Sequence, residues 1–237
     1  MDSQQVAIQD SRVWWGPWDG LGIAVVAYIL PQIVAVLVAS GLHLNIEDQS
    51  FGTIIITSLI EILSLGVVMG YVRSKSPSLA ALGLRLKRVV TVFWAIPTYV
   101  AYFIVTALSI SWISRIFPKF NADESQNIPF STSMAGPLRL GIVFFILVLL
   151  VPITEEIMFR GFLYKGFKKK VGPVYAAVVT SALFGLAHFQ WNISIDTCIL
   201  SFFLIYLYEK TESLWPSIAL HAIKNSLAFL VLFIYKP

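Results

Sequence analysis

The sequence predicts an all-α protein, a polytopic bundle of about seven transmembrane helices that forms a single membrane domain over residues 1–237. Composition is the first reason, because 57% of the residues are hydrophobic and only 13% are charged, whereas a soluble domain carries about 25% charged residues. The second reason is a mean hydropathy of +0.79 over the whole chain. The third is the recurrence of apolar runs close to the roughly 20 residues that a helix needs to cross a bilayer.

The apolar runs define seven predicted spans separated by polar loops. In chain order they cover residues 20–40, 51–72, 89–113, 138–164, 173–189, 195–208 and 214–235. The fifth and sixth are short for a bilayer, so we expect them to be tilted, re-entrant or buried within the bundle. An eighth span would have to come from residues 1–19 or 115–137, which are more polar. The longest polar loop runs from Lys119 to Pro137.

Lysine and arginine in the loops predict the orientation, because cytoplasmic loops are enriched in both. If the N-terminus is cytoplasmic, eleven of them lie inside: Arg12, Arg73, Lys75, Arg85, Lys87, Arg88, Lys165, Lys168, Lys169, Lys170 and Lys210. Four lie outside: Arg115, Lys119, Arg139 and Lys236. This bias favours a cytoplasmic N-terminus and an external C-terminus.

The polar and acidic N-terminal segment predicts no cleavable signal peptide, so the first span is expected to act as the insertion signal. The small size and the lack of targeting segments indicate a prokaryotic plasma membrane. Six tryptophans near predicted span ends suggest an aromatic belt: Trp14, Trp15, Trp18, Trp112, Trp191 and Trp215. The isoelectric point near 9.2 does not indicate nucleic acid as a partner, because the positive charges sit in short loops between apolar runs. The basic run Lys168–Lys170 is interpreted as a topology signal that touches anionic lipid.

Polar residues at membrane depth point to a functional site, because ionisable groups inside a bilayer are costly. Once loops and tails are set aside, eight remain: Glu61, Glu155, Glu156, Arg160, His188, His221, Lys224 and Asn225. All but Glu61 belong to the fourth, fifth and seventh spans. The single cysteine, Cys198, excludes an internal disulfide and a cysteine-rich metal site.

The stretch VPITEEIMFRGF places two carboxylates and a guanidinium on one apolar helix. Glu156 and Arg160 are four residues apart and share a face, which predicts an ion pair. Glu155 points about 100° away and is left without that partner, as suits a general base or acid. Pro152 lies three residues upstream and is expected to kink the helix.

Two further helices each offer a short polar face. His188 follows Phe184 by four residues, and Asn225 follows His221 by four residues. The small residues Ala182, Gly185 and Ala187 predict close helix approach beside His188. Because no serine is paired with an obvious base and Cys198 stands apart, the implied nucleophile is water.

These residues form three motifs: Glu155-Glu156-x-x-x-Arg160, Phe184-x-x-x-His188 and His221-x-x-x-Asn225. In this order and spacing, residues 138–232 resemble the protease core of the intramembrane glutamic endopeptidases, that is, the type II CAAX prenyl endopeptidases and their bacterial relatives linked to bacteriocin processing and self-immunity. The resemblance implies that Glu155 and His188 activate water to cut a membrane-associated peptide or protein. It also implies that His221 and Asn225 hold the oxyanion, that Glu156 and Arg160 orient the site with Phe184 in support, and that no cofactor is needed.

Other interpretations of the same residues stay open at this stage. The charged residues could form a structural ion network, the histidines and Asn225 could be interhelical polar contacts, and Phe184 could serve packing alone. Glu61 is interpreted as structural, with Arg160 or Lys224 as candidate partners, and Lys224 is expected to pair or to reach toward the interface. Alternative functions are a zinc-dependent membrane protease, for which the HExxH signature is absent, a catalytically idle scaffold or bacteriocin self-immunity protein, and a proton-coupled transporter, for which no inverted repeat is visible.

Overall fold

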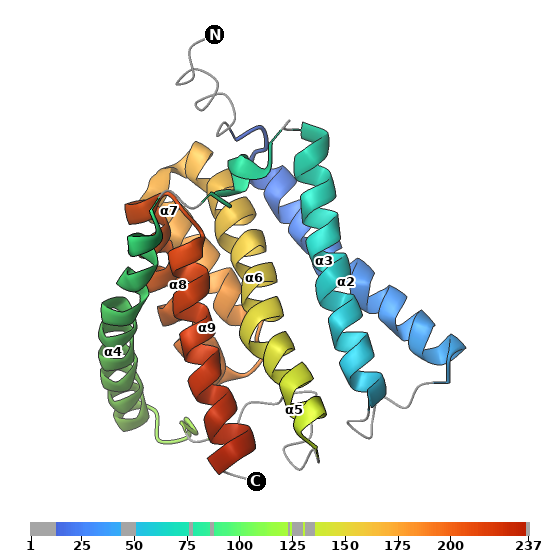
Figure 1. Cartoon of the computed structure of the whole chain (residues 1–237). Helices are drawn as coiled ribbons and strands as arrows, with labels where there is room; N and C mark the ends of the chain where they lie inside the picture. The colour runs from blue at the N-terminus through green and yellow to red at the C-terminus, as the bar shows by residue number, and fades with distance from the viewer. Residues whose placement is uncertain are drawn as a thin grey trace.

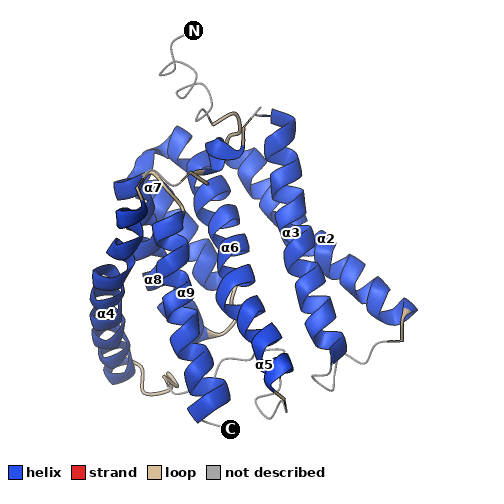
Figure 2. Cartoon of the chain, in the orientation of Figure 1, coloured by secondary structure: helices blue, strands red, loops and turns tan. Residues whose placement is uncertain are grey.

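The computed structural model describes residues 13–43, 51–75, 78–85, 88–122, 124, 130 and 136–235. Within these ranges the chain forms helices and connecting loops without a β-strand (Figure 2), so the all-α prediction is confirmed. Six helices there are long and apolar enough to cross a membrane. Arg12, Lys87, Lys236 and much of the Lys119–Pro137 loop lie outside the described residues.

The first two spans form a hairpin at one edge of the bundle, with α4 at the opposite edge (Figure 1). They are α2 (Pro17–Gly41) and α3 (Phe51–Lys75). Helix α2 begins where the Asp19 carboxylate accepts a hydrogen bond from the Gly16 N–H at 2.9 Å, which satisfies a free donor at the helix start. Two short 3-10 helices, η1 (Leu79–Leu82) and η2 (Val89–Trp94), then lead into α4 (Ala95–Ile116).

One long helix runs from Pro137 to residue 171 and carries the two glutamates. Its segments are α5 (Pro137–Phe144), η3 (Phe145–Leu150), α6 (Val151–Glu156), η4 (Ile157–Tyr164) and the start of α7 (Lys165–Leu186). Both η3 and η4 are π-helical, with one extra residue per hydrogen-bonded turn. The helix breaks at Gly172, whose φ of +80° suits glycine, and Pro173 starts the returning part of α7. The predicted fourth and fifth spans are therefore two arms of this broken helix.

Helices α8 (Trp191–Thr211) and α9 (Trp215–Phe229), the latter extended by the π-helical η5 (Leu230–Tyr235), complete the bundle. Helix α8 packs closely on α7, because a β-carbon on Gly185 would lie 2.5 Å from the Ser194 carbonyl oxygen. The predicted close approach at Gly185 is thus confirmed. Helix α8 begins four residues before its predicted start at residue 195.

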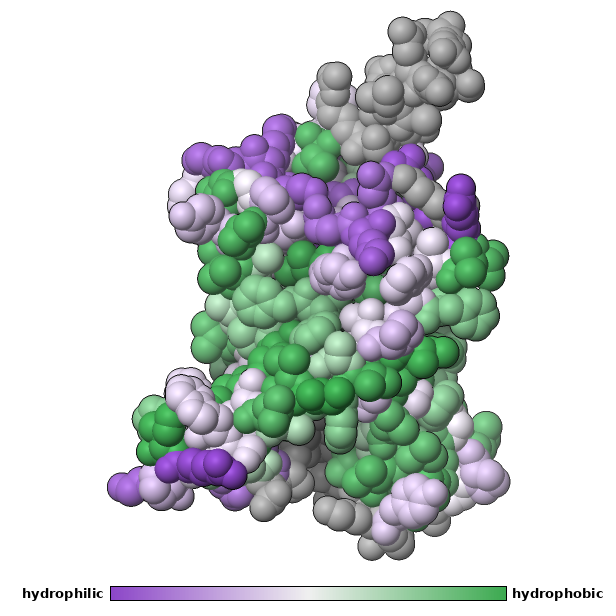
Figure 3. Space-filling view, turned by 90° about the vertical axis from the view of Figure 1, so that its left-hand side faces the viewer, coloured by the Kyte–Doolittle hydropathy of each residue, from purple (hydrophilic) through white to green (hydrophobic). Residues whose placement is uncertain are grey.

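The surface has the polarity of a membrane protein, and the chain is a multi-pass membrane protein. A green apolar zone lies below a purple polar rim in Figure 3. Large apolar side chains face outward from the middle of the helices, among them Leu37, Phe103 and Leu108, exposed by 67%, 59% and 66%. The start of α2 and the end of η5 lie at opposite ends of the bundle (Figure 1), as an odd number of crossings requires.

The tryptophans expected to form an aromatic belt differ in their exposure. Trp18, Trp112 and Trp191 are exposed near helix ends, as an aromatic belt predicts. Trp15 is fully buried instead, and its indole N–H donates to the Phe162 carbonyl at 2.9 Å.

The structure also bears on the possible eighth span. Between Phe117 and Ala122, which the structure does describe, the chain forms no helix that could begin such a span.

Candidate active site

A buried charged cluster occupies the middle of the bundle. Glu156 and Arg160 form the predicted ion pair, with Arg160 Nη1 3.0 Å from Glu156 Oε1 and both side chains fully buried. His221 of α9 joins them, since its Nδ1 lies 3.0 Å from the same carboxylate oxygen. The Arg160 guanidinium also lies over the Phe184 ring, 4.2 Å from its centroid. These contacts join Glu156 of α6, Arg160 of η4, Phe184 of α7 and His221 of α9. The cluster therefore fixes the positions of these four segments relative to one another.

Glu155 has a different environment from its neighbour Glu156. Its side chain keeps 22% exposure, whereas that of Glu156 is fully buried. Its carboxylate Oε2 lies 3.6 Å from His221 Nε2. His221 therefore stands between the two glutamates, with Nδ1 toward Glu156 and Nε2 toward Glu155. The roughly 100° between consecutive helical residues explains why one carboxylate enters the ion pair and the other does not.

Glu155 and His188 line two separate cavities and so form part of the wall between them. The first cavity, of about 180 Å³, lies between α6, α8 and α9 and also touches Thr197, His221 and Asn225. The second, of about 160 Å³, lies between α2, α3, α6 and α7. Gln32, Glu61 and Ser64 give the second cavity a polar lining. A water or an extended chain could thus reach the Glu155 carboxylate from two sides.

His188 is held by the backbone of its own helix. Its Nδ1 lies 2.8 Å from the Phe184 carbonyl oxygen and 3.5 Å from Thr197 Oγ1. A carbonyl only accepts hydrogen bonds, so Nδ1 carries the proton and Nε2 of the neutral ring is an acceptor. The Phe184 ring packs edge-on against both His188 and His221, with centroids 5.1 and 6.0 Å apart. Phe184 therefore sets the spacing of the two imidazoles.

Asn225 holds a backbone carbonyl that Pro152 leaves free. In the π-helical η3, the Val151 N–H donates to the Ile146 carbonyl, five residues back. The Leu147 carbonyl would next take the N–H of residue 152, but proline has none. Asn225 Nδ2 donates to that carbonyl at 2.8 Å. The kink predicted at Pro152 thus takes the form of a widened turn. The hydrogen bond to Leu147 uses one N–H of the Asn225 amide and leaves the second N–H for another acceptor.

The seven residues of the three motifs thus surround one region of the bundle, each lining a cavity or contacting a residue that does. The sequence did not single out two of their neighbours, Asp196 and Thr197. Asp196 of α8 lies 3.5 Å from Lys224 Nζ and hydrogen-bonds the Tyr102 hydroxyl. The available signal was an acid inside the sixth predicted span, one residue after its predicted start at residue 195. The pairing expected of Lys224 is confirmed.

Glu61 lines the second cavity together with Thr154. The partners considered for it are engaged elsewhere, Arg160 by Glu156 and Lys224 by Asp196. Among the residues that the structure describes, no three His, Cys, Asp or Glu side chains converge as ligands of one metal ion would. The zinc alternative stays a matter for a chelator experiment.

Comparison with known proteins supports the resemblance seen in the motifs. Residues 137–227 match the family model described as type II CAAX prenyl endopeptidase Rce1-like. The "Putative membrane peptidase YdiL" of Bacillus subtilis is 28% identical over 86 residues, which cover 36% of this chain but only 34% of that protein. The UPF0177 protein YxdF of Lactococcus lactis is 28% identical over 147 residues, 59% of this chain and 75% of that protein. No solved structure shows significant similarity.

Proposed function

We propose that this chain, which belongs through residues 137–227 to the Rce1-like family of type II CAAX prenyl endopeptidases, is a membrane-embedded endopeptidase whose water-activating base is Glu155. The observation that carries the proposal is the position of Glu155 in the wall between two cavities. A base must reach both water and the substrate carbonyl. Glu156 is fully buried in its contacts with Arg160 and His221 and cannot meet that need.

His188 supports Glu155 in holding the attacking water. Since its Nδ1 proton is given to the Phe184 carbonyl, Nε2 of the neutral ring can accept a hydrogen bond from a water in either cavity. A water held between two acceptors, a carboxylate and an imidazole nitrogen, presents its lone pair to a third group. That third group is the carbonyl carbon of the scissile peptide bond.

His221 is the first oxyanion donor in this mechanism. The Glu156 oxygen that meets Nδ1 already accepts from Arg160, so Nδ1 donates to it. The mechanism requires a further proton on Nε2, which makes the ring cationic, and a Glu155 carboxylate 3.6 Å away that balances the charge. In this protonation state Glu155 is a base and His221 Nε2–H is a donor, as the reaction requires.

The steps follow from these assignments. Water attacks the carbonyl carbon while Glu155 takes its proton, and the carbonyl electrons move to the oxygen. His221 Nε2–H and the second N–H of Asn225 stabilise that oxyanion. The C–N bond then breaks, and the Glu155 carboxylic acid returns the proton to the leaving amine. No cofactor takes part, and Glu156 and Arg160 act by orienting His221.

The substrate class follows from the location of the site. Both cavities lie within the helices that span the membrane, so the substrate is a membrane-associated peptide or protein. The two named relatives are bacterial, which supports a bacterial plasma membrane for this chain. The distribution of lysine and arginine supports a cytoplasmic N-terminus.

The test is cleavage of membrane-anchored peptides, prenylated and unprenylated, by the purified full chain in detergent. We expect wild type and Glu124→Gln, which changes an exposed carboxylate in the loop after α4, to cleave equally. Glu155→Gln should lose at least about 100-fold in rate while keeping its unfolding temperature, as expected for loss of a general base. Cleavage by folded Glu155→Gln would contradict the proposal, and loss of activity with chelator that zinc restores would favour the zinc protease.

A further inference from the structure

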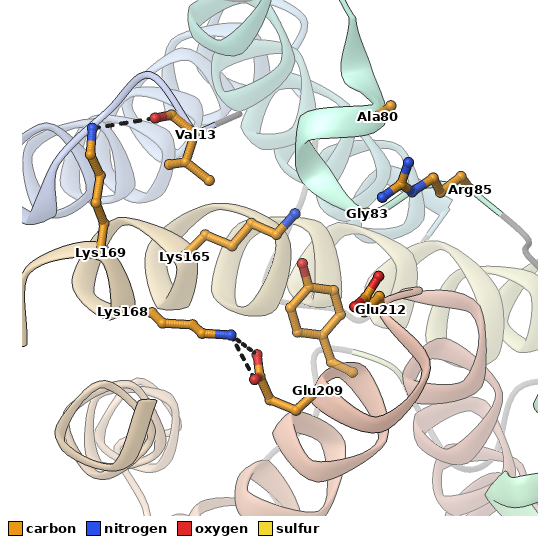
Figure 4. A pocket seen from close by; sticks show the side chains of 10 residues that line it. Val13, Ala80, Gly83, Arg85, Lys165, Lys168, Lys169, Glu209 and Glu212 are labelled. Carbon is orange, nitrogen blue, oxygen red and sulfur yellow. Dashed lines mark hydrogen bonds and ion pairs between the residues drawn. The ribbon is translucent and has the colours of Figure 1, made fainter. Parts of the chain in front are cut away.

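A third cavity, of about 620 Å³, lies at the end of the bundle where α2 begins, away from the two cavities at Glu155 (Figure 4). Its lining includes four cationic side chains and two carboxylates: Arg85, Lys165, Lys168, Lys169, Glu209 and Glu212. We call this cavity the basic pocket. Four positive charges against two negative ones leave it net positive. Such a pocket favours an anion over a cation.

The walls of the basic pocket are held firmly by packing and backbone contacts. The η1 turn forms one wall, and the Leu82 carbonyl would meet a β-carbon on Gly161 at 2.8 Å. Gly83 ends the turn with φ +88° and accepts a hydrogen bond from the Leu214 N–H at 3.0 Å. A β-carbon on Gly83 would come within 2.8 Å of the Tyr208 ring. The pocket is therefore formed before any ligand arrives.

The cations of the pocket are only partly neutralised from within. Lys168 Nζ is held by both oxygens of Glu209, at 2.6 and 2.7 Å. Lys165 uses one of its three N–H groups on the Ala81 carbonyl at 2.6 Å. The remaining donors on Arg85 and Lys169 have weaker or missing partners. Lys169 reaches only the Val13 carbonyl at 3.3 Å, and Arg85 Nε is buried with no hydrogen-bond partner among the described residues.

Figure 4 shows Lys165 and Arg85 extending toward the same space from two different segments of the chain. A planar guanidinium and an ammonium that converge on one space suit a tetrahedral oxyanion, because arginine can bind two of its oxygens and lysine a third. A carboxylate has only two oxygens to accept from these N–H donors, whereas a phosphate has more and suits the pocket better.

We propose that the basic pocket binds the phosphate group of an anionic phospholipid. The pocket lies at the end of the helices, at the level of the polar rim seen in Figure 3, where lipid headgroups reside. The returning arm of α7 begins with exposed apolar side chains, including Val174 and Tyr175, exposed by 70% and 72%. The basic residues then bind lipid at a defined site, beyond the general attraction of a basic run to an anionic surface.

The test measures binding of phosphatidylglycerol and phosphatidylcholine to the full chain in detergent by native mass spectrometry. We expect one phosphatidylglycerol per chain and much weaker binding of phosphatidylcholine. The variant Arg85→Gln/Lys169→Gln removes two pocket charges and leaves the Lys168–Glu209 pair intact. It should weaken phosphatidylglycerol binding roughly tenfold or more, the factor expected for one lost charge-assisted hydrogen bond.

The matched control removes the same charge outside the pocket. In Lys170→Gln/Lys210→Gln the lost side chains lie over the Trp18 and Trp94 rings instead, so the affinity should change less than about twofold. Competition with inorganic phosphate identifies the source of the ligand: displacement means that soluble phosphates also enter, and no displacement means that the lipid is required. Equal losses in both double variants, or equal binding of both lipids, would overturn the proposal.

Discussion

Replacing Asn225 by alanine tests two roles of its side-chain amide, one in stability and one in catalysis. In the structure Asn225 Nδ2 donates to the Leu147 carbonyl at 2.8 Å. In the proposed mechanism its second N–H stabilises the oxyanion. The first use contributes to stability and the second to rate, so the two effects can be measured independently.

The expected loss of stability follows from the state of the Leu147 carbonyl. Its partner in the widened turn would be residue 152, which is proline, so Asn225→Ala leaves this carbonyl without a donor from the protein. An unsatisfied buried acceptor costs about 1 to 3 kcal/mol, and interhelical hydrogen bonds in membranes contribute at most about 1.7 kcal/mol. We therefore expect the free energy of unfolding to fall by about 1 to 2 kcal/mol.

A second substitution tests the cause. Pro152→Ala supplies an N–H five residues after Leu147, in register with the bond from Val151 to Ile146. In that background Asn225→Ala should cost less than about 0.5 kcal/mol, which makes the two sites strongly coupled in a double-mutant cycle. Peptidase activity should stay low in both Asn225→Ala backgrounds, because neither restores the oxyanion donor.

The assay is equilibrium unfolding in mixed micelles followed by tryptophan fluorescence, with peptide cleavage measured on the same samples. Ser226→Ala is the matched control, since the Ser226 hydroxyl only bonds the Ala222 carbonyl of its own helix at 2.7 Å. An equal loss of stability from Asn225→Ala with and without Pro152 would refute the explanation of the Leu147 contact. Full activity in Asn225→Ala/Pro152→Ala would refute the oxyanion role.

Two further predictions concern packing at the same site. Glu156→Gln or Arg160→Met alone should lower the free energy of unfolding by about 3 to 5 kcal/mol, because each leaves a buried charge unpaired; the double variant should cost clearly less than the sum in a denaturation experiment, and strict additivity would argue against the ion pair. Gly185→Ala should cost about 1 to 3 kcal/mol by overpacking, since the added carbon would lie 2.5 Å from the Ser194 carbonyl oxygen. Gly66→Ala, with nothing within 4 Å of its added carbon, should be neutral in the same unfolding measurement.

The residues of the site could be predicted from the sequence because the bilayer makes them conspicuous. A charged residue in an apolar run of about 20 residues has few explanations, so Glu155, Glu156 and Arg160 stood out. The pairing of Glu156 with Arg160 followed from their spacing alone and is confirmed at 3.0 Å. Asp196 was missed although it lies inside the sixth predicted span, because it is one residue from the predicted start, whereas the helix begins four residues earlier and places Asp196 in its second turn.

The contacts between helices could not be predicted in the same way. Helical spacing says which residues share a face, but not which helix that face meets. The approach of His221 to both glutamates depends on how α9 packs on α6. Trp15 illustrates the same limit: its type and position suited the interface, yet its indole N–H lies inside the bundle and donates to the Phe162 carbonyl of η4.

The two π-helical stretches connect these observations. In each of them a carbonyl accepts a hydrogen bond from a side chain far along the chain: Leu147 from Asn225, and Phe162, which also accepts from the Lys165 N–H, from Trp15. The stretches flank α6, the six residues that carry both glutamates. An uninterrupted α-helix would satisfy the Leu147 carbonyl itself and leave that carbonyl no hydrogen bond to offer α9. The irregular backbone before Glu155 and Glu156 therefore ties their helix to α9, which carries the proposed catalytic groups His221 and Asn225, and this contact is a reason for a membrane protein to retain geometry that costs helical regularity.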